Sequence, residues 1–542
     1  MEGKIYPKLI SNNRHNYMYD QSRINKMTKV YKSILLYSFI FFIALTCLKE
    51  CFVGVKQLFW GFVYNNPLYV CGSFDGSGSY GGYLAVCVSL LVAYAIHYRS
   101  LNSRTMLSTI LYRMVIIVIC AALIMISSTL CRSAILALCC GLSFLVIQTD
   151  HLKSKAKYII KKNWTSILLG CCIIISGVYL IKKPSADGRF FMNKINIYSI
   201  CTNGWRGTGI GSFGGTYGNA QAIYFKKQIE KNGSSDLDWK SIGEHDRMSA
   251  DCPNDSFNDY LFIGVERGPL VMFILLFIVI LAIVISFRRK TLWGCGLITF
   301  AVFATFYYPL RLQQFQLLFI ALTLLCVMDL KLCDCDQLDY TIDQQTCQPK
   351  RLINILTVII VIGGLCIVIK PNNSQVEKPL RLWEKAKPWY NSEYYDNYVK
   401  ECDTLMTFFK DNPQFLFEYG HSLNKIGLYE KSDSVLMIGT RISSDPMFWN
   451  VMGNNSLAQG KYREAEGRYK HAFYMVPNRL YPLVLLTKLY YEEGDTARFL
   501  EMTDVVENFV PKVESIRTEK LRAEIRELKN SYLTEIEENN ED

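Results

Sequence analysis

Nine apolar stretches, each about 16 to 21 residues long, occupy most of the chain before residue 370. A helix needs roughly 20 such residues to cross the hydrocarbon core of a bilayer. Each stretch carries almost no charge, whereas the chain after residue 370 is ordinary polar sequence. The sequence therefore predicts an all-α fold, a polytopic membrane helix bundle followed by a separate C-terminal domain. The predicted spans are residues 34–50, 82–98, 108–128, 131–148, 164–182, 268–286, 292–308, 314–329 and 352–370.

The composition excludes several other protein classes. Half of the residues are hydrophobic and 20% are charged, which rules out a disordered chain and a small disulfide scaffold. The net charge of +11 does not indicate nucleic acid, because the basic residues cluster in short loops between apolar stretches, where orientation signals occur. Residues 1–32 contain no apolar stretch followed by a small-residue cleavage site, so we expect no cleaved signal peptide.

The basic loops also predict the orientation. With nine alternating spans, five basic segments fall on one side, and the positive-inside rule makes that side the cytoplasm. The segment 1–32 is then cytoplasmic, and the transmembrane domain 33–370 presents a large loop, residues 183–267, to the outside. The C-terminal domain lies outside as well. The basic residues are Lys26, Lys29, Lys32, Arg99, Arg104, Lys153, Lys155, Lys157, Lys161, Lys162, Arg288, Arg289, Lys290, Lys331, Lys350 and Arg351.

Residues 380–537 contain an internal repeat. Gly427, Gly460 and Gly494 open similar short segments 33 and 34 residues apart. Prolines follow a similar interval, at Pro413, Pro446, Pro477 and Pro511. This pattern resembles the tetratricopeptide repeat, a helix–turn–helix unit of 34 residues. We expect an α-solenoid of roughly three units with a charged helix at 512–537 as its cap. Such repeats bind many kinds of partner or only brace a fold, so the pattern leaves their role open.

Three arginines fall on the predicted outer face, namely Arg132, Arg189 and Arg311. A guanidinium stays charged in a partly dry site and matches the geometry of phosphate oxygens. The set therefore predicts a pyrophosphate site at the lipid surface. An alternative for Arg132 is an anchor that snorkels to the membrane interface.

The large loop contains a glycine-rich run, residues 204–215, which includes Gly209 and Gly211. Glycines permit tight turns and expose backbone N–H groups that can cradle a phosphate, although such runs are more often plain turns. Asn258, Tyr260 and Glu266 follow close to the start of the sixth span.

Together these segments resemble the O-antigen ligase and polymerase superfamily of bacterial membrane glycosyltransferases, especially members with C-terminal tetratricopeptide repeats. The resemblance covers about residues 65–330 and lies in the order and spacing of short motifs relative to the spans. The matching segments are Gly72-Ser73-Phe74 through Tyr83-Leu84-Ala85, Cys131-Arg132-Ser133-Ala134, Gly188-Arg189, Gly207-Thr208-Gly209-Ile210-Gly211-Ser212-Phe213, Asn258-Asp259-Tyr260-Leu261 and Glu266-Arg267-Gly268.

The resemblance implies a GT-C-like bundle in the bacterial inner membrane that performs an inverting transfer on its periplasmic face. The donor would be a glycan on undecaprenyl pyrophosphate, and the acceptor a hydroxyl of a lipid, a glycan or a protein. Arg132, Arg189 and Arg311 would bind the pyrophosphate, with Gly209, Gly211, Asn258 and Tyr260 supporting the site. No metal or other cofactor is implied, and no nucleic acid partner is expected.

One departure from the family concerns the base. Ligases of this family often place a histidine directly before the asparagine of the Asn–x–Tyr–Leu motif, and Phe257 stands there in this chain. Asp255 is the first candidate to replace it, followed by His245, and Glu266 completes the predicted catalytic set. The alternatives are that Asp255 caps the following helix and that His245 is a solvated loop residue. Further candidates for the base are Glu244 and Asp259.

Other functions stay open at this point. Within the same superfamily the chain can be a repeat-unit polymerase or a protein O-oligosaccharyltransferase. A non-enzymatic scaffold, in which the repeats recruit a protein partner for envelope assembly, is less consistent with so many spans. A transporter would place charged or helix-breaking residues within the spans, and these spans contain few.

The orientation can be tested directly. A reporter that works only outside the cytoplasm should be active when fused after residue 220 or residue 375, and silent after residue 157. Activity after residue 157 would overturn the orientation and the site assignments that depend on it.

Overall fold

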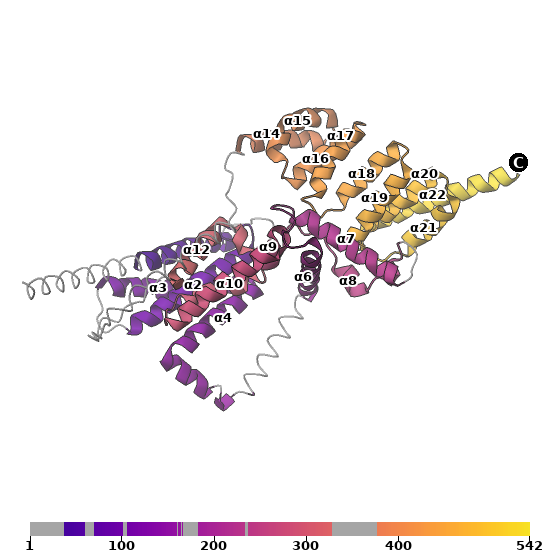
Figure 1. Cartoon of the computed structure of the whole chain (residues 1–542). Coiled ribbons are helices and arrows are strands. Elements are labelled where there is room, and N and C mark those ends of the chain that lie inside the picture. Colours follow the sequence, from indigo (N-terminus) through magenta and orange to yellow (C-terminus); the bar gives the residue numbers. More distant parts are fainter. Residues whose placement is uncertain are drawn as a thin grey trace, which may run out of the picture. The chain divides into compact units, whose positions relative to one another are not determined.

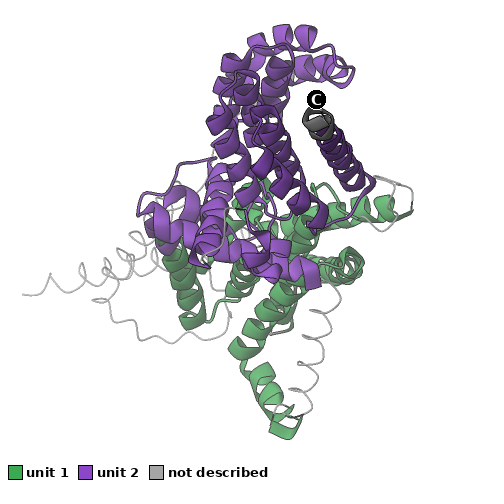
Figure 2. Ribbon diagram, turned by 90° about the vertical axis from the view of Figure 1, so that its right-hand side faces the viewer, with its two compact units in different colours: residues 1–175, 274–369 green, residues 176–273, 370–542 purple. Residues whose placement is uncertain are grey.

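The computed structural model describes residues 37–59, 70–100, 106–159, 161–163, 165, 183–232, 237–327 and 377–541. These residues form helices, turns and loops, and no strand occurs among them. Two compact units are present, and both combine segments far apart in the sequence (Figures 1 and 2). Unit 1 comprises residues 1–175 and 274–369, and unit 2 comprises residues 176–273 and 370–542.

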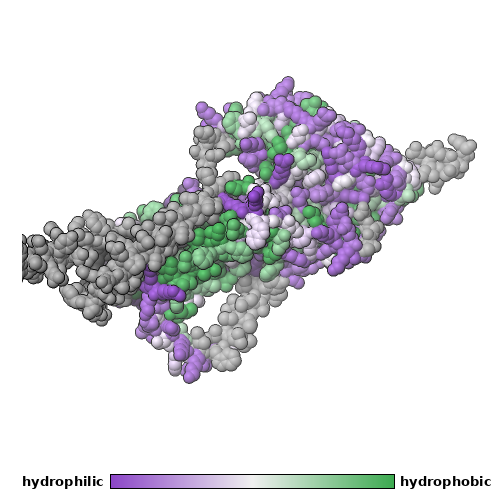
Figure 3. All heavy atoms as spheres, in the orientation of Figure 1, coloured by the Kyte–Doolittle hydropathy of each residue, from purple (hydrophilic) through white to green (hydrophobic). Residues whose placement is uncertain are grey.

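Unit 1 contains the apolar helices. They are Tyr37–Phe59, α2 (Ser77–Ser100), α3 (Met106–Thr129), α4 (Arg132–Gln148), α11 (Gly294–Ala304), the 3₁₀ helix η3 (Pro309–Arg311), α12 (Gln313–Val327) and most of α10 (Pro269–Arg288). Hydrophobic side chains gather over this unit in Figure 3. Helix α2 is its centre, because 83% of its most apolar window is buried, against 39% for Tyr37–Phe59 and for α3.

Four of these helices are long and apolar enough to cross a membrane: Tyr37–Phe59, Ser77–Arg99, Met106–Thr129 and Pro269–Arg288. Arg132–Gln148 and Asp150–Asn163, bent by 108° against each other, make a fifth if they form one span. Helices α11 and α12 are shorter. The predicted spans 164–182 and 352–370 lie outside the described residues, apart from residue 165. The predicted number of nine therefore stays a prediction.

The first described helix differs from its prediction. We expect a span over 34–50 from the apolar run, but the helix continues to Phe59. The charge of Glu50 does not end it, because this carboxylate is 6% exposed and accepts hydrogen bonds from the Ser73 backbone N–H and hydroxyl, both at 2.9 Å. The loop before α2 thus folds back onto the helix Tyr37–Phe59 and supplies hydrogen bonds to the Glu50 carboxylate. From sequence alone, this charge predicts the end of the span.

Small residues at the start of α2 explain its central position. A Cβ atom on Gly82 would lie 2.1 Å from Phe303, and one on Gly78 would lie 2.5 Å from Tyr307. On the other side, a Cβ atom on Gly81 would lie 2.9 Å from the Thr129 hydroxyl. The run of glycines and serines is therefore needed for helix packing, since any larger residue would push the helices apart.

Unit 2 contains the large loop and the C-terminal helices. The loop folds into α6 (Lys183–Asn203), α7 (Phe213–Lys231), the 3₁₀ helix η2 (Trp239–Ser241), α8 (Glu244–Ser249) and α9 (Asp259–Arg267). The C-terminal helices are α14 (Glu377–Asn391), α15 (Tyr395–Phe409), α16 (Pro413–Lys425), α17 (Tyr429–Thr440), α18 (Met447–Ala458), α19 (Tyr462–Met475), α20 (Tyr481–Glu493), α21 (Thr496–Asn508) and α22 (Ile516–Glu541).

The C-terminal helices pack in order, each against the next. Gly427, Gly460 and Gly494 adopt positive φ angles of 81°, 68° and 77° in the turns that join α16 to α17, α18 to α19 and α20 to α21. Within a pair, a Cβ atom on Gly453 would lie 2.3 Å from the Tyr469 ring, so glycine permits the close approach of α18 and α19. These features fit the predicted repeat, whose identity as a tetratricopeptide solenoid stays a prediction.

The large loop shares one hydrophobic core with the C-terminal helices. Helix α7 packs along α19, and one cluster of buried side chains contains residues of both. Its loop members include Phe213, Tyr217, Phe225 and Ile229, and its C-terminal members include Tyr469, Phe473, Leu483, Leu486 and Phe499. A separate cluster fills α14 to α18. The loop is thus a structural part of the C-terminal domain.

A histidine in this shared core predicts a pH dependence. His471 lies 3.0 Å from the Asn219 side-chain oxygen and packs on Trp449, and burial, aided by Lys226, lowers its pKa to about 4. An unfolded histidine titrates near 6.5, so between about pH 6.5 and 4 the unfolded chain binds more protons and stability falls as the pH falls, by at most about 1.4 kcal/mol per pH unit.

In the full chain, the midpoint of thermal unfolding of unit 2 should therefore be lower at pH 5 than at pH 7.5. His471→Gln should reduce this difference. An equal difference in both proteins would contradict the assignment.

Candidate functional site

Arg132 begins helix α4 at a corner that contacts the start of α2. Leu130 has a φ of 50°, which turns the chain sharply between α3 and α4. The Cys131 thiol lies 3.8 Å from the Gly78 carbonyl oxygen and 3.3 Å from the Ser133 hydroxyl. These contacts hold the half-buried Arg132 at the amino end of one helix and beside the amino end of another.

Arg311 lies in η3, on the corner between α11 and α12, and is exposed. This corner also contacts the start of α2, because the Tyr307 hydroxyl accepts a hydrogen bond from Ser79 at 3.4 Å. The rings of Tyr307 and Tyr308 stack with centroids 4.4 Å apart. The structure therefore brings the Arg132 and Arg311 corners to the same end of α2.

This end of unit 1 is suited to bind an anion. The amino ends of α2 and α4 carry partial positive charge, which favours phosphate. Two guanidinium groups on adjoining corners add full charges with fork-like donors.

Arg189 lies on α6 in unit 2, so the three predicted pyrophosphate ligands are divided between the units. Its guanidinium carbon lies 4.4 Å from the centroid of the Phe257 ring. Phe257 thus holds an arginine by a cation–π contact.

His245 on α8 contacts the same end of α6. Its Nε2 atom lies 3.5 Å from an oxygen of Asp187, and Asp187 is two residues before Arg189. The histidine side chain is 66% exposed and the aspartate 14%. The structure therefore adds an unexpected pair to the predicted set, a solvent-accessible imidazole beside a mostly buried carboxylate.

Asp246 fixes α8 against the neighbouring helices. Its carboxylate accepts hydrogen bonds from Lys194 at 2.7 Å and from the Tyr224 hydroxyl at 2.6 Å. Burial by itself would raise the pKa of Asp246, but these two donors outweigh it and lower the pKa. Asp246 therefore stays ionised and keeps His245 at the Asp187 end of α6.

The cap of α9 is Asn258 rather than Asp255. The Asn258 side-chain oxygen accepts hydrogen bonds from the backbone N–H groups of Tyr260 and Leu261, both at 3.1 Å. Beneath it, the Ser256 hydroxyl accepts a hydrogen bond from Asn196 at 3.0 Å. Since the cap position is filled, the capping alternative for Asp255 has no support in this geometry.

Glu266 holds the glycine-rich run in place. It is 4% exposed, and its Oε1 atom accepts hydrogen bonds from the N–H groups of Gly211 at 2.9 Å and Phe213 at 3.3 Å. The Glu266 carbonyl also accepts from the Gly209 N–H at 2.9 Å. The backbone N–H groups of Gly209 and Gly211, which were predicted to support a phosphate, thus donate to the backbone carbonyl and to the side-chain carboxylate of Glu266, respectively.

The glycine-rich run passes close to the end of α9 at Gly207 and Gly268, and this contact requires glycine. A Cβ atom on Gly207 would lie 2.4 Å from the Gly268 nitrogen, and the φ angles of the two residues are 69° and 89°. At the start of α9, Tyr260 is 8% exposed, and burial, reinforced by Asp259, raises the pKa of its hydroxyl. Tyr260 is therefore a neutral group at neutral pH.

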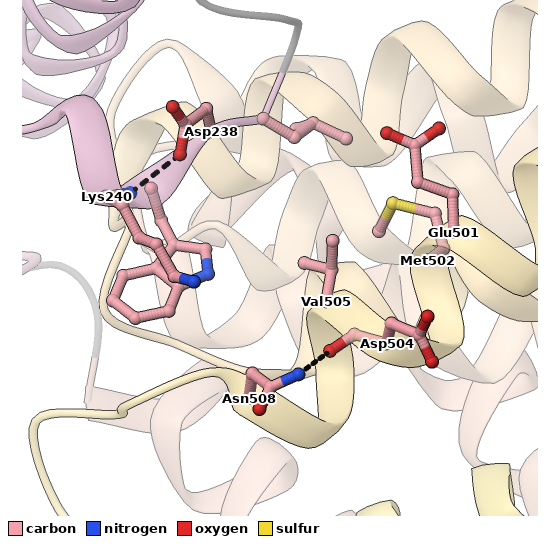
Figure 4. Close-up of a pocket in the computed structure, with 9 residues that line it drawn as sticks. Asp238, Lys240, Glu501, Met502, Asp504, Val505 and Asn508 are labelled. Atoms are coloured by element: carbon pink, nitrogen blue, oxygen red, sulfur yellow. Dashed lines mark hydrogen bonds between the residues drawn. The ribbon is translucent and has the colours of Figure 1, made fainter.

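Unit 2 also contains a cavity of about 290 Å³ where η2 meets α21 (Figure 4). None of the predicted site residues lines it. Its lining residues are Leu237, Asp238, Trp239, Lys240, Glu501, Met502, Asp504, Val505 and Asn508.

Sequence reasoning missed the Asp187–His245 pair and the anchoring role of Glu266. Asp187 and His245 are 58 residues apart, and no local pattern connects them.

In the part of the chain that the structure describes, no three His, Cys, Asp or Glu side chains gather as metal ligands. Neither a protein-family model nor a curated protein matches the sequence.

The geometry of Glu266 predicts the effect of its substitutions. Glu266→Gln keeps an oxygen acceptor for the Gly211 N–H, so we expect a loss of stability of only about 1 kcal/mol and no large change in the rate of any reaction that the chain catalyses. Glu266→Ala leaves buried N–H groups without an acceptor and should cost about 1–3 kcal/mol for each. A general acid or base would instead lose about 100- to 10,000-fold in rate on Glu266→Gln, and that result would contradict the anchoring role.

Proposed function

We propose that the chain transfers a glycan from undecaprenyl pyrophosphate to an acceptor hydroxyl on the periplasmic face of the bacterial inner membrane. The observation that carries this proposal is the pairing of motif segments within each unit. Residues 207–213 bind Glu266, and Arg189 stacks on Phe257 beside the Asn258 motif. In unit 1, the Arg132 corner contacts the Gly78 segment.

The proposed transfer reaction requires a base for the acceptor proton and cations for the leaving pyrophosphate. The acceptor oxygen attacks the anomeric carbon, the bond from that carbon to the pyrophosphate oxygen breaks, and the acceptor proton passes to a base. Negative charge grows on the departing pyrophosphate. In unit 1, Arg132 and Arg311 would stabilise this charge, which is the effect of preorganised cations on a developing charge.

The base has two candidates, Asp255 and His245. Asp255 lies two residues before Phe257, the position at which ligases of this family often have a histidine. His245 has the support of Asp187, since a carboxylate oxygen 3.5 Å from the Nε2 atom can orient the imidazole ring. Substitution separates them, because Asp255→Asn and His245→Gln each remove one proton acceptor and preserve size and polarity.

The proposal is tested by supplying membranes that contain the protein with an undecaprenyl-pyrophosphate-linked glycan and candidate acceptors. Release of undecaprenyl pyrophosphate together with a glycosylated acceptor is the expected result. The acceptor used distinguishes a ligase from a repeat-unit polymerase and from a protein O-oligosaccharyltransferase. Absence of release with every acceptor class would favour the alternative of a membrane-anchored scaffold.

Arg132 gives the sharpest substitution in this assay. Arg132→Lys keeps the charge but loses the forked geometry, so we expect a loss on the order of 2–4 kcal/mol in the transition state, or roughly 30- to 1000-fold in rate. Normal activity of Arg132→Ala at normal abundance would instead favour the snorkelling anchor.

A further inference from the structure

The C-terminal helices hold α8 through hydrogen bonds to its backbone. The Asn478 side-chain amide, which is 5% exposed, donates to the Arg247 carbonyl at 2.8 Å and to the Ala250 carbonyl at 2.9 Å. One amide group thus binds the last turn of α8 at two points, and both acceptors lie within five residues of His245.

The Arg247 side chain forms a second connection. It is 3% exposed, and its Nη1 atom donates to the Val510 carbonyl at 2.7 Å. The guanidinium carbon also lies 4.7 Å from the Trp239 ring centroid and 5.6 Å from that of Phe509. A buried guanidinium is costly unless its surroundings satisfy it, and here a carbonyl after α21 and two aromatic rings do so.

The segment before Phe257 is held in the same way. Ser444 donates to the Pro253 carbonyl at 2.8 Å, and Arg479 lies 2.8 Å from the Cys252 thiol. The Lys512 ammonium adds an ion pair with Asp251 at 3.3 Å. Three residues of the C-terminal domain therefore contact residues 251–253, just before Asp255.

Close backbone contacts fix the start of α7. A Cβ atom on Gly214 would lie 2.4 Å from the Ile442 carbonyl oxygen, and one on Gly215 would lie 2.3 Å from that of Thr440. These neighbours are backbone atoms, which cannot move aside as a side chain can. By contrast, a Cβ atom on Gly467 in α19 meets nothing within 4 Å.

We propose that the C-terminal domain from the end of α17 at Thr440 to α21, with the segment 509–512 that follows, acts as an intrachain clamp that positions the reacting groups of the large loop. Asn478 and Arg247 are its main positioning residues, acting through α8 on His245. This inference rests on the proposed transfer function and deepens it. The ligand of this face of the repeats is then the chain's own loop rather than a separate protein.

The test uses the full-length protein in membranes and compares Asn478→Ala, Gly215→Ala and the matched control Gly467→Ala. The first readout is the rate at which a membrane-impermeant maleimide labels Cys252, with the exposed Cys201 on α6 as internal reference. We expect at least a tenfold faster reaction at Cys252 in the two clamp variants, with Cys201 unchanged and the control like the parent.

The second readout is glycan transfer. Displaced reacting groups should lower kcat by about 10- to 100-fold, because small misplacements are costly in catalysis, while the KM for the lipid-linked donor stays within twofold. Gly467→Ala should match the parent.

Each other outcome has a defined meaning. Unchanged labelling in both clamp variants would show that these contacts do not hold the loop and would overturn the clamp. Faster labelling with normal kcat would show that the loop is held but that the positioning role is wrong. A parent without transfer activity would contradict the proposed function, while the labelling would still test the clamp. Because the two clamp variants lie in different elements, misfolding of one leaves the other as the test.

Discussion

The shared hydrophobic core between the large loop and the C-terminal helices determines most of unit 2. Helix α7 buries Phe213, Tyr217 and Phe225, and helices α19 and α20 supply the other half of that core. An isolated loop of this length has no second layer against which to bury an apolar helix face. The C-terminal domain provides that layer, so the loop adopts fixed helices, and its polar residues take defined positions.

The arrangement of the polar residues follows from that core. Asn478 and Arg247 hold α8, Asp246 joins α8 to α6, and His245 is thereby placed beside Asp187. On α9, Glu266 satisfies the N–H groups of the glycine-rich run at its entry into α7. These polar contacts surround the hydrophobic core, and Arg247 packs directly on Phe509 of that core, so the core determines where they form.

Local sequence patterns predicted the helices and turns, because these depend mainly on residues close together in the chain. The apolar runs predicted the long helices, and the glycine spacing predicted the turns at Gly427, Gly460 and Gly494. Contacts between distant segments were not predictable. From sequence alone the charge of Glu50 predicts the end of a span, because its hydrogen bonds from Ser73 are not visible there. In the same way, no sequence pattern indicates that Asn219 is a neighbour of His471. In these cases the deciding partner lies 23 to 252 residues away.

Hydrogen–deuterium exchange on the full-length protein in membranes measures the central claim, that the large loop and the C-terminal helices fold as one unit. If they do, the backbone amides of α7 should exchange as slowly as those of α19, because both open only when their common core opens. Fast exchange in α7 beside slow exchange in α19 would show that the loop is not part of that core, and it would contradict the account.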